Sequence, residues 1–455
     1  MKRAASVFSG RKTLVVGLAS TGLSCSRFLA KCGASVVATD MKPASSLPGV
    51  KALVDMGVDV RVGGHIGINL KDIETVVVSP GVPYDQPILV EARVSGAEVI
   101  SDMELAYRFI DSSVIAVAGT NGKSTTTTLI GRMIEDAGHT VFTGGNLGTP
   151  AIEYVETGLR ADFCVLEVSS FHLETTKDFN PHIGALLNIT EDHLERYDGF
   201  DHYARTKFRL FENQTPGDWA IVNLNDPVIA RRAKTNFGKG RRMPFTSAGV
   251  LKEGVFLRGG DIVYVQPDRA EEIYPTAGFK LKGSHNVENI MAAIAAARLS
   301  GVEKGVIVKT LKSFTGLPHR MELVRELNGV AYIDDSKGTN VGALDMALRG
   351  INGRVILIAG GRDKGGDYKA LSKAVKEKVK FMVLIGEARF KMKDSLGGFT
   401  DTVLANRLEE AVSAAHTKAA VGDTVLLCPA CSSFDMFKDY KERGDEFKRL
   451  VAALR

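Results

Sequence analysis

The 455-residue chain has no long apolar run and contains only five cysteines. No apolar segment approaches the roughly 20 residues that a membrane-spanning helix needs, and residues 1–12 lack the apolar core of a signal peptide. An odd, sparse set of cysteines is typical of a reducing compartment and not of a disulfide-bonded scaffold. These absences predict a cytoplasmic protein that does not insert into a membrane.

A strong excess of charge is also missing. The sequence has 58 Lys and Arg against 53 Asp and Glu, a formal net charge of +5, and it has no basic run interleaved with aromatics. Nucleic acid is therefore not an expected partner, whereas small phosphate-bearing substrates are compatible with this balance. Neither a short-period repeat nor a low-complexity segment is visible.

Two of the cysteines form the motif Cys428-Pro-Ala-Cys431. A zinc site of this type needs a second pair of ligands, which the motif lacks. Because the motif follows an apolar run, we interpret it as a strand end and its loop, not as a redox or metal site.

The clearest positive signal is a strand, a loop and a helix near residue 120. Val114–Ala118 is an apolar run that predicts a buried strand, and a helix is predicted from Lys123 through Glu135. Backbone N–H groups of such a loop, at a helix N-terminus, favour an anion. Lys123 would reach the terminal phosphates of a nucleotide, and the Ser124 hydroxyl would bind Mg²⁺. The predicted phosphate loop consists of Gly119, Thr120, Asn121, Gly122, Lys123, Ser124 and Thr125, with Val117 where the usual pattern has its first glycine.

The N-terminal segment predicts a strand–helix–strand unit of the dinucleotide-binding type. A strand at Thr13–Gly17 precedes an apolar-periodic helix, and a second strand ends at Asp40. The glycine fingerprint is degraded at Ala19 and is weak evidence for NAD. Asp40 is either a ribose or uridine contact or the cap of a turn. A further strand from Thr75 leads into a rigid turn at Gly81.

Polar side chains also follow the strands of the middle segment. The strand Asp162–Glu167 ends in a carboxylate, as a magnesium-binding strand of a phosphate-loop protein does; a surface acid is the alternative. His193 lies just past a strand, and Lys207 lies on a helix, where a solvated lysine is the default. Asn286 and Asn289 share one side of a helix's first turn, where they either cap the helix or contact a nucleotide base.

Strands and helices alternate again toward the C-terminus. Apolar runs beginning at Val330, Val355, Phe381 and Thr424 predict a second doubly wound sheet, whereas residues 241–282 predict small antiparallel strands. The predicted fold is α/β with three domains. These are a Rossmann-like N-terminal domain at 1–101, a central P-loop ATPase-like domain at 102–316 and a C-terminal Rossmann-like domain at 317–455.

Together these motifs resemble the Mur ligase family, the ATP-dependent amide-forming enzymes of peptidoglycan synthesis, over essentially the whole chain. The loop at 119–125 is similar to the family's phosphate loop, including the missing first glycine. Within the family, the stretches 166–171, 314–320, 335–340 and 429–435 resemble those of the member that adds D-glutamate. The Asp-Asn-Pro-Arg signature of the diaminopimelate- or lysine-adding relative is absent.

The resemblance implies a mechanism. ATP phosphorylates the terminal carboxylate of UDP-MurNAc-L-Ala, the amine of D-glutamate attacks the acyl phosphate, and the tetrahedral intermediate collapses to amide and phosphate. Because anions approach one another, Lys123 and two Mg²⁺ ions would neutralise the developing charge. Ser124 and Glu167 resemble the ligands of one metal, and His193 and a carbamylated Lys207 those of the other. A monomer is expected.

The resemblance also assigns the substrate-binding residues. Asn289, Arg320 and Asp335 would hold the base, phosphates and ribose of ATP. The UDP-sugar would meet Ser20, Thr21, Asp40, Lys42, Gly81 and Asn146, although the family usually has Thr-Arg where Met41-Lys42 stands here. D-Glutamate would meet Thr339, Lys364, Ser433, Phe434 and Tyr440, with Lys337 and Lys364 supplying positive charge.

Three alternative functions stay open at this stage. The first is an amide ligase on the same scaffold that uses another amino acid. The second is a P-loop NTPase that acts as a switch and hydrolyses ATP without an acceptor. The third is an NAD-linked oxidoreductase, which depends only on the degraded N-terminal fingerprint.

Overall fold

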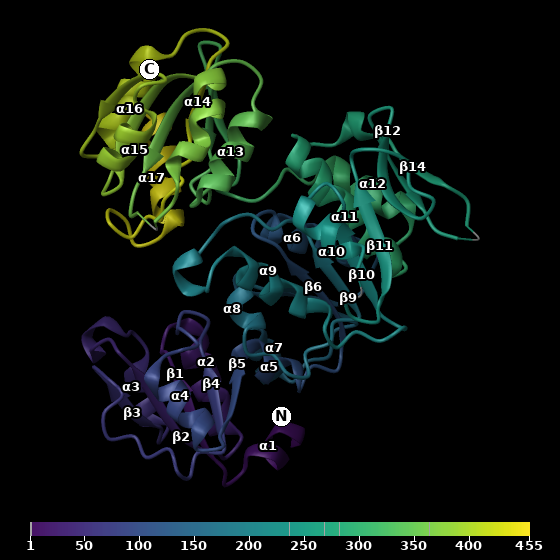
Figure 1. Ribbon diagram of the computed structural model, residues 1–455, viewed down its shortest axis with the longest axis vertical. Helices are drawn as coiled ribbons and strands as arrows, with labels where there is room; N and C mark the ends of the chain where they lie inside the picture. Colours follow the sequence, from purple (N-terminus) through teal and green to yellow (C-terminus); the bar gives the residue numbers. More distant parts are fainter. Residues whose placement is uncertain (1, 236, 268, 282, 364) are drawn as a thin grey trace. The chain divides into compact units, whose positions relative to one another are not determined.

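The computed structural model describes residues 2–235, 237–267, 269–281, 283–363 and 365–455 (Figure 1). Tertiary contacts divide the chain into two compact units. The first unit contains two sheets and the second contains one. The first comprises Met1–Ile189, Arg196–Ala277 and Glu288–Thr310, and the second comprises Thr190–Glu195, Gly278–Val287 and Leu311–Arg455.

The N-terminal sheet of the first unit is parallel, with strand order β3-β2-β1-β4-β5. Apolar side chains of β1 and β4, such as Leu14 and Val76, pack with Leu89 of helix α4 in one core. The predicted strand–helix–strand unit is therefore confirmed. The strands are β1 (Lys12–Val16), β2 (Ser35–Asp40), β3 (Asp59–Val62), β4 (Thr75–Val78) and β5 (Glu98–Ser101), and the helices are α1 (Lys2–Phe8), α2 (Ser20–Lys31), η1 (Ala44–Ser46), α3 (Val50–Asp55), α4 (Pro87–Val94) and α5 (Asp102–Tyr107).

The central sheet has nine strands in the order β14-β13-β12-β11-β10-β9-β6-β8-β7. The strands are β6 (Ser113–Ala118), β7 (Val141–Gly145), β8 (Phe163–Glu167), β9 (Ile183–Leu186), β10 (Trp219–Asn223), β11 (Arg241–Thr246), β12 (Gly254–Arg258), β13 (Asp261–Val265) and β14 (Glu272–Tyr274). The helices are α6 (Lys123–Asp136), α7 (Ala151–Thr157), α8 (Ser170–Leu173), η2 (Leu194–Arg196), α9 (Phe200–Phe208), η3 (Arg209–Phe211), α10 (Pro227–Ala233), η4 (Thr276–Gly278), α11 (Ser284–Leu299) and α12 (Lys304–Ser313).

The prediction of small antiparallel strands over 241–282 is wrong for part of that segment. Strands β12, β13 and β14 do pair antiparallel, but β11 pairs parallel with both β10 and β12. Helix α10 supplies the crossover between the parallel strands β10 and β11, and the buried Met243 and Phe245 extend the apolar sheet.

The six-stranded sheet of the second unit has the order β15-β16-β20-β17-β18-β19, with β15 antiparallel to β16 and the other pairs parallel. Leu357 and Leu426 face a core with α13, α14 and α15, and Ile356 and Val425 face a core with α16 and α17. The alternation along β17 and β20 shows a sheet buried on both faces. The elements are β15 (Glu322–Leu327), β16 (Val330–Asp334), α13 (Val341–Gly350), β17 (Val355–Gly360), η5 (Tyr368–Leu371), α14 (Ser372–Lys378), β18 (Val379–Ile385), α15 (Arg389–Leu396), β19 (Asp401–Leu404), α16 (Leu408–Lys418), β20 (Thr424–Leu427) and α17 (Tyr440–Ala452).

Three α/β sheets match the predicted fold class. The domain limits at 101/102 and 316/317 stay predictions. Within the described ranges, no helix combines the length and apolar character that a membrane crossing needs.

Candidate active site

Five of the six expected nucleotide-sugar residues lie at or just after the ends of neighbouring strands of the N-terminal sheet, where open α/β sheets bind ligands, and the sixth, Asn146, follows β7 of the central sheet. Asp40, at the end of β2, accepts hydrogen bonds from the backbone N–H of Leu18 at 2.7 Å and of Lys42 at 2.8 Å. Its carboxylate therefore organises two loops, which is the structural alternative considered for it. The remaining expected residues lie at the start of α2 (Ser20, Thr21) and in the turn after β4 (Gly81).

A residue that the sequence did not single out holds the Gly81 turn. The Arg196 guanidinium donates to the carbonyls of Pro80 and Val82, both at 2.8 Å, pairs with Glu174 at 2.6 Å and stacks on Phe171 at 4.1 Å. Both charged side chains are 10% exposed. The planar guanidinium group of arginine donates to two carbonyls and a carboxylate at the same time, and the ammonium of lysine cannot replace it.

The predicted phosphate loop joins β6 to α6. Gly119 and Gly122 have φ values of 153° and 83°, which favour glycine. The Asn188 side chain, after β9, accepts from Asn121 N–H at 2.8 Å and donates to the Asn121 carbonyl at 3.0 Å. Nothing in the sequence assigns Asn188 a role, because its partner Asn121 follows the neighbouring strand β6 and only the fold brings the two together.

Lys123 is the first residue of α6. Its ammonium donates to the carbonyls of Gly119 at 2.9 Å and Thr120 at 2.7 Å. The positive charge of Lys123 is therefore held over the loop. A phosphate bound there would also meet the backbone N–H groups at the N-terminus of α6.

Glu167 and Ser124, the expected ligands of one metal, lie together. The Ser124 hydroxyl donates to Glu167 Oε2 at 2.5 Å, and Asn146 Nδ2 donates to Oε1 at 2.7 Å. Ser124 and Glu167 are both 3% exposed, and β6 pairs with β8 so that Val117 lies opposite Glu167. A buried hydroxyl and carboxylate offer the oxygen ligands that Mg²⁺ prefers, so these residues fit a magnesium ion beside the loop.

Asn289, the expected base contact, packs against the loop itself. A Cβ added to Gly122 would lie 2.2 Å from Asn289 Oδ1. Asn289 is 5% exposed and Asn286 is 6% exposed. Asn289 and the phosphate loop both belong to the first unit, so this contact lies within it.

We expect Gly122→Ala to weaken ATP binding at least about tenfold, because the added methyl group displaces Asn289 and the residue must keep a left-handed conformation. Gly138→Ala is the matched control: Gly138 also has a positive φ, 88°, but a Cβ there meets nothing within 4 Å. Calorimetric titration with ATP measures the difference. Equal ATP affinity in the two variants would contradict the assigned contact.

Lys207 is not the solvated lysine that its helix position suggested. It is 2% exposed, its ammonium donates to the Gly119 carbonyl at 2.9 Å, and it lies 4.6 Å from the centre of the Tyr203 ring. The Tyr203 hydroxyl in turn bonds Thr120 Oγ1 at 3.0 Å. Lys207 is therefore part of the phosphate-loop surroundings.

His193 belongs to the second compact unit, whereas Lys207 belongs to the first. His193 has a φ of 53°, and its neighbour Asp192 accepts from the Asn340 side chain at 3.1 Å. The predicted pairing of His193 with Lys207 around a second metal stays a prediction.

In the second unit, the strand ends of β16, β20 and β17 carry the other expected residues at one sheet edge. Asp335 follows β16 and accepts from Met321 N–H at 3.2 Å and from the Cys428 thiol at 3.1 Å. Burial raises the pKa of the Asp335 carboxyl to about 7, although Cys428 and the charge of Arg320 act in the opposite direction. The charge of Arg320 therefore acts on the Asp335 carboxyl, so these two expected nucleotide-binding residues lie near each other.

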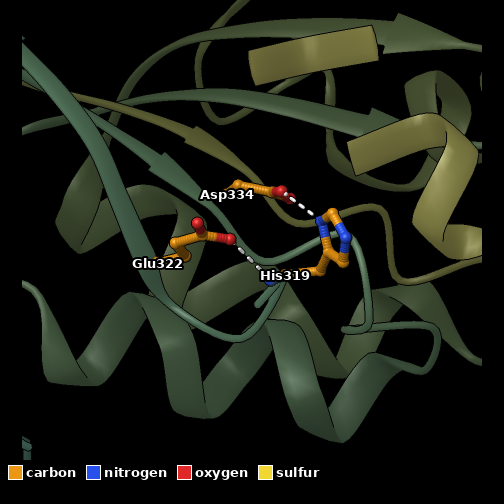
Figure 2. Close-up of side chains that lie close together, drawn as sticks. All are labelled: His319, Glu322 and Asp334. Atoms are coloured by element: carbon orange, nitrogen blue, oxygen red, sulfur yellow. Dashed lines mark hydrogen bonds and ion pairs between the residues drawn. The ribbon is translucent and has the colours of Figure 1, made fainter. Parts of the chain in front are cut away.

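A cluster formed by His319, Glu322 and Asp334 orders the segment that contains Arg320 (Figure 2). His319 Nδ1 bonds Asp334 at 2.7 Å, and the His319 N–H donates to Glu322 at 2.8 Å. These bonds hold His319 at a φ of 62°. The nitrogen and oxygen atoms with which His319, Glu322 and Asp334 could bind a metal lie within 4.8 Å of one another. However, the Lys448 ammonium lies 3.4 Å from Glu322 and balances its charge. We therefore interpret the cluster as a support for the loop and not as a metal site.

The expected D-glutamate residues follow the same three strands. Ser433 is 3% exposed and Phe434 is 65% exposed; Tyr440 begins α17, and Lys337 lies 4.1 Å from its ring centre. Thr339 is half-buried after β16. Lys364 lies outside the described residues.

Arg443 was missed by the sequence analysis. It is 1% exposed and donates to the Ser336 carbonyl at 2.9 Å and the Cys431 carbonyl at 3.2 Å. Burial lowers the pKa of its guanidinium to about 10. On sequence grounds Arg443 is one of many charges on an amphipathic helix, and nothing local distinguishes it.

The fold and the site define a phosphate-loop nucleotide-binding protein built from α/β domains. Three family models match: "Mur ligase MurD-like, N-terminal domain" over 11–101, "Mur ligase middle domain" over 117–297 and "Mur ligase, glutamate ligase domain" over 319–431. The chain belongs to the Mur ligase family, which confirms the resemblance and the three-domain α/β fold.

Curated relatives cover nearly the whole chain. It is 49% identical over 445 residues to the UDP-N-acetylmuramoylalanine–D-glutamate ligase of Geotalea uraniireducens, covering 98% of each chain. It is 48% identical over 451 residues to the ligase of the same name from Geobacter metallireducens, again covering 98% of each. A solved pseudomurein peptide ligase type C from Methanothermus fervidus shares the fold, with a TM-score of 0.62 at 18% identity, covering 98% of this chain and 100% of that one.

Proposed function

We propose that the protein is an ATP-dependent ligase that joins D-glutamate to UDP-N-acetylmuramoyl-L-alanine through an acyl phosphate, in peptidoglycan precursor synthesis. The observation that carries this proposal is the 49% identity over 98% of both chains to a ligase of that name. An amide ligase also accounts for the C-terminal sheet edge, which neither the switch NTPase nor the NAD-linked oxidoreductase requires, and for Asp40, which the switch NTPase does not require.

The phosphate loop would bind ATP and direct its γ-phosphate at the sugar-linked carboxylate. Lys123 supplies a cation where charge accumulates during transfer. Asn289 already contacts the loop, and Arg320 and Asp335 would hold the phosphates and the ribose. D-Glutamate would be held by Thr339, Lys364, Ser433, Phe434 and Tyr440.

Ser124 and Glu167 would hold one Mg²⁺, which would neutralise phosphate oxygens. For a second Mg²⁺ we propose His193 and Lys207. An ammonium repels a divalent cation, so Lys207 would act as a carbamate, formed when its neutral amine adds CO₂ and releases a proton. The carbamate offers oxygen ligands where the amine offers none.

The nucleotide-sugar would bind at the edge that carries Ser20, Thr21, Asp40, Lys42 and Gly81, and it would also meet Asn146, which follows β7. Asn146 also fixes Glu167. This residue therefore connects the sugar site with the metal ligand. We expect the protein to act in the cytoplasm as a monomer.

Arg196→Lys is expected to raise the KM for UDP-MurNAc-L-Ala about tenfold, because lysine keeps the charge opposite Glu174 but loses the fork that holds the Gly81 turn. The KM values for ATP and D-glutamate should stay within about twofold. Arg241→Lys is the control. Arg241 also stacks on an aromatic ring, Trp219, at 4.1 Å, but it lies on β11 of the central sheet and not at the Gly81 turn. An unchanged KM for the sugar in Arg196→Lys would remove the role given to this clamp.

Phosphate release from ATP, measured with purified protein, UDP-MurNAc-L-Ala and a panel of amino acids, tests the proposed function. Release should require the nucleotide sugar and D-glutamate together. Turnover with L-glutamate or folate in their place, or with no acceptor, would overturn the proposal.

A further inference from the structure

The Cys428-Pro-Ala-Cys431 motif has no role in the proposed chemistry, yet its two thiols are fully buried, at 0% and 1% exposure. The motif directly follows β20, which lies between β16 and β17 in the sheet. It therefore lies between the two loops that carry the expected nucleotide and D-glutamate residues.

Cys428 is bonded to the nucleotide side. Its thiol donates to Asp335 Oδ2 at 3.1 Å, and burial keeps the pKa of the Cys428 thiol well above its ordinary value, so the proton that it donates is retained at neutral pH. The contact is closely packed, because a Cβ on Gly338 would lie 2.6 Å from both the sulfur and Oδ2. The backbone adds a second link, from Ala430 N–H to the Gly338 carbonyl at 2.8 Å.

Cys431 is bonded to the other side. Its sulfur lies 3.1 Å from the Tyr368 hydroxyl, which donates to Asp363 at 2.8 Å. Because the phenol proton is used for Asp363, the thiol is the donor to Tyr368; burial raises the pKa of the Cys431 thiol to about 11, so that proton is present. Asp363 also accepts from Lys391 at 2.8 Å and from Gly365 N–H at 3.0 Å, and it directly precedes Lys364 in the sequence.

We propose that the two thiols are positioning residues with separate tasks: Cys428 orients Asp335 toward the ATP ribose, and Cys431, through Tyr368 and Asp363, orients the segment after β17 for D-glutamate. This inference rests on the proposed function, since it uses the substrates assigned there. Neither thiol touches a reacting atom or changes its oxidation state.

Steady-state kinetics of Cys428→Ala, Cys428→Ser, Cys431→Ala and Cys431→Ser test the division of tasks. Cys428→Ala should raise the KM for ATP about tenfold and leave that for D-glutamate within about twofold, and Cys431→Ala should do the reverse. Each serine variant should recover most of the loss, because a hydroxyl replaces the donor. Tyr368→Phe breaks the same chain of hydrogen bonds from Cys431 to Asp363 at another residue. It should therefore change the two KM values in the same way as Cys431→Ala.

The pH profile gives a readout that general destabilisation would not produce. Burial raises the pKa of Asp335; Cys428, Arg320 and the Met321 N–H lower it, and Asp334 raises it. Loss of the thiol donor raises that pKa further, so the acidic limb of kcat/KM for ATP should move to higher pH in Cys428→Ala and return in Cys428→Ser.

The inference is overturned if both alanine variants change the two KM values equally, or if only their thermal stability changes. Wild-type turnover that requires D-glutamate, measured in the same assay, separates such a result from failure of the proposed function.

Discussion

Lys123→Met is expected to lower kcat for phosphate release at least about a thousandfold, which corresponds to about 4 kcal/mol of transition-state stabilisation. The ammonium is held over the loop by the carbonyls of Gly119 and Thr120. Methionine keeps the aliphatic stem and removes the charge that would meet the transferred phosphoryl group. The helix should persist, because its first turn is ordered by the loop glycines and not by this side chain.

Lys304→Met is the matched control. Lys304 also opens a helix, α12, but its side chain is exposed and lies 5.9 Å from the Tyr274 ring centre, away from the loop. Thermal unfolding of both variants checks that the fold is retained. If Lys123→Met keeps more than about a tenth of the wild-type kcat, the catalytic role of Lys123 is wrong.

Much of this architecture could be predicted because the information is local. Strands β1, β4, β6 and β17 are buried on both faces and appear in the sequence as continuous apolar runs. The loops that follow such parallel runs meet at one sheet edge, which is where Ser124 and Glu167 lie together. Strands β3, β15 and β19 lie at sheet edges and are only partly buried, so their patterns are weak and they were not predicted.

What could not be predicted depends on partners distant in the sequence. The hydrogen bonds of Asn188, Arg196 and Arg443 connect loops that only the fold brings together. Lys207 is an instructive intermediate case: it lies four residues after Tyr203 on α9, on the buried side of that helix. Helical spacing from an aromatic residue therefore carried a signal of burial, which the usual exposure of lysine outweighed.

Lys207→Ala is expected to lower kcat about a hundredfold or more, as loss of a ligand or of its support at a metal site does. The buried amine lies within hydrogen-bonding distance of the Gly119 carbonyl, so a carbamate formed on it would place an anion beside the phosphate loop. Removal of that anion should impair the binding of the second Mg²⁺. A small effect on kcat would contradict the role of Lys207.

Added short-chain carboxylic acids should restore part of the activity of Lys207→Ala, because the truncated side chain leaves room for a carboxylate where the carbamate would lie. Lys123→Ala is the control, since a carboxylate cannot replace a missing cation, and it should show no rescue.

NMR with isotopically labelled bicarbonate gives a readout that does not depend on turnover. A carbamate carbonyl signal should be present in the wild-type protein and absent from Lys207→Ala. If the signal is missing from the wild type, or if the acids rescue both variants equally, Lys207 acts as an ammonium. Its bond to Gly119 and its contact with Tyr203 would then be its whole contribution, namely to hold the phosphate loop in place.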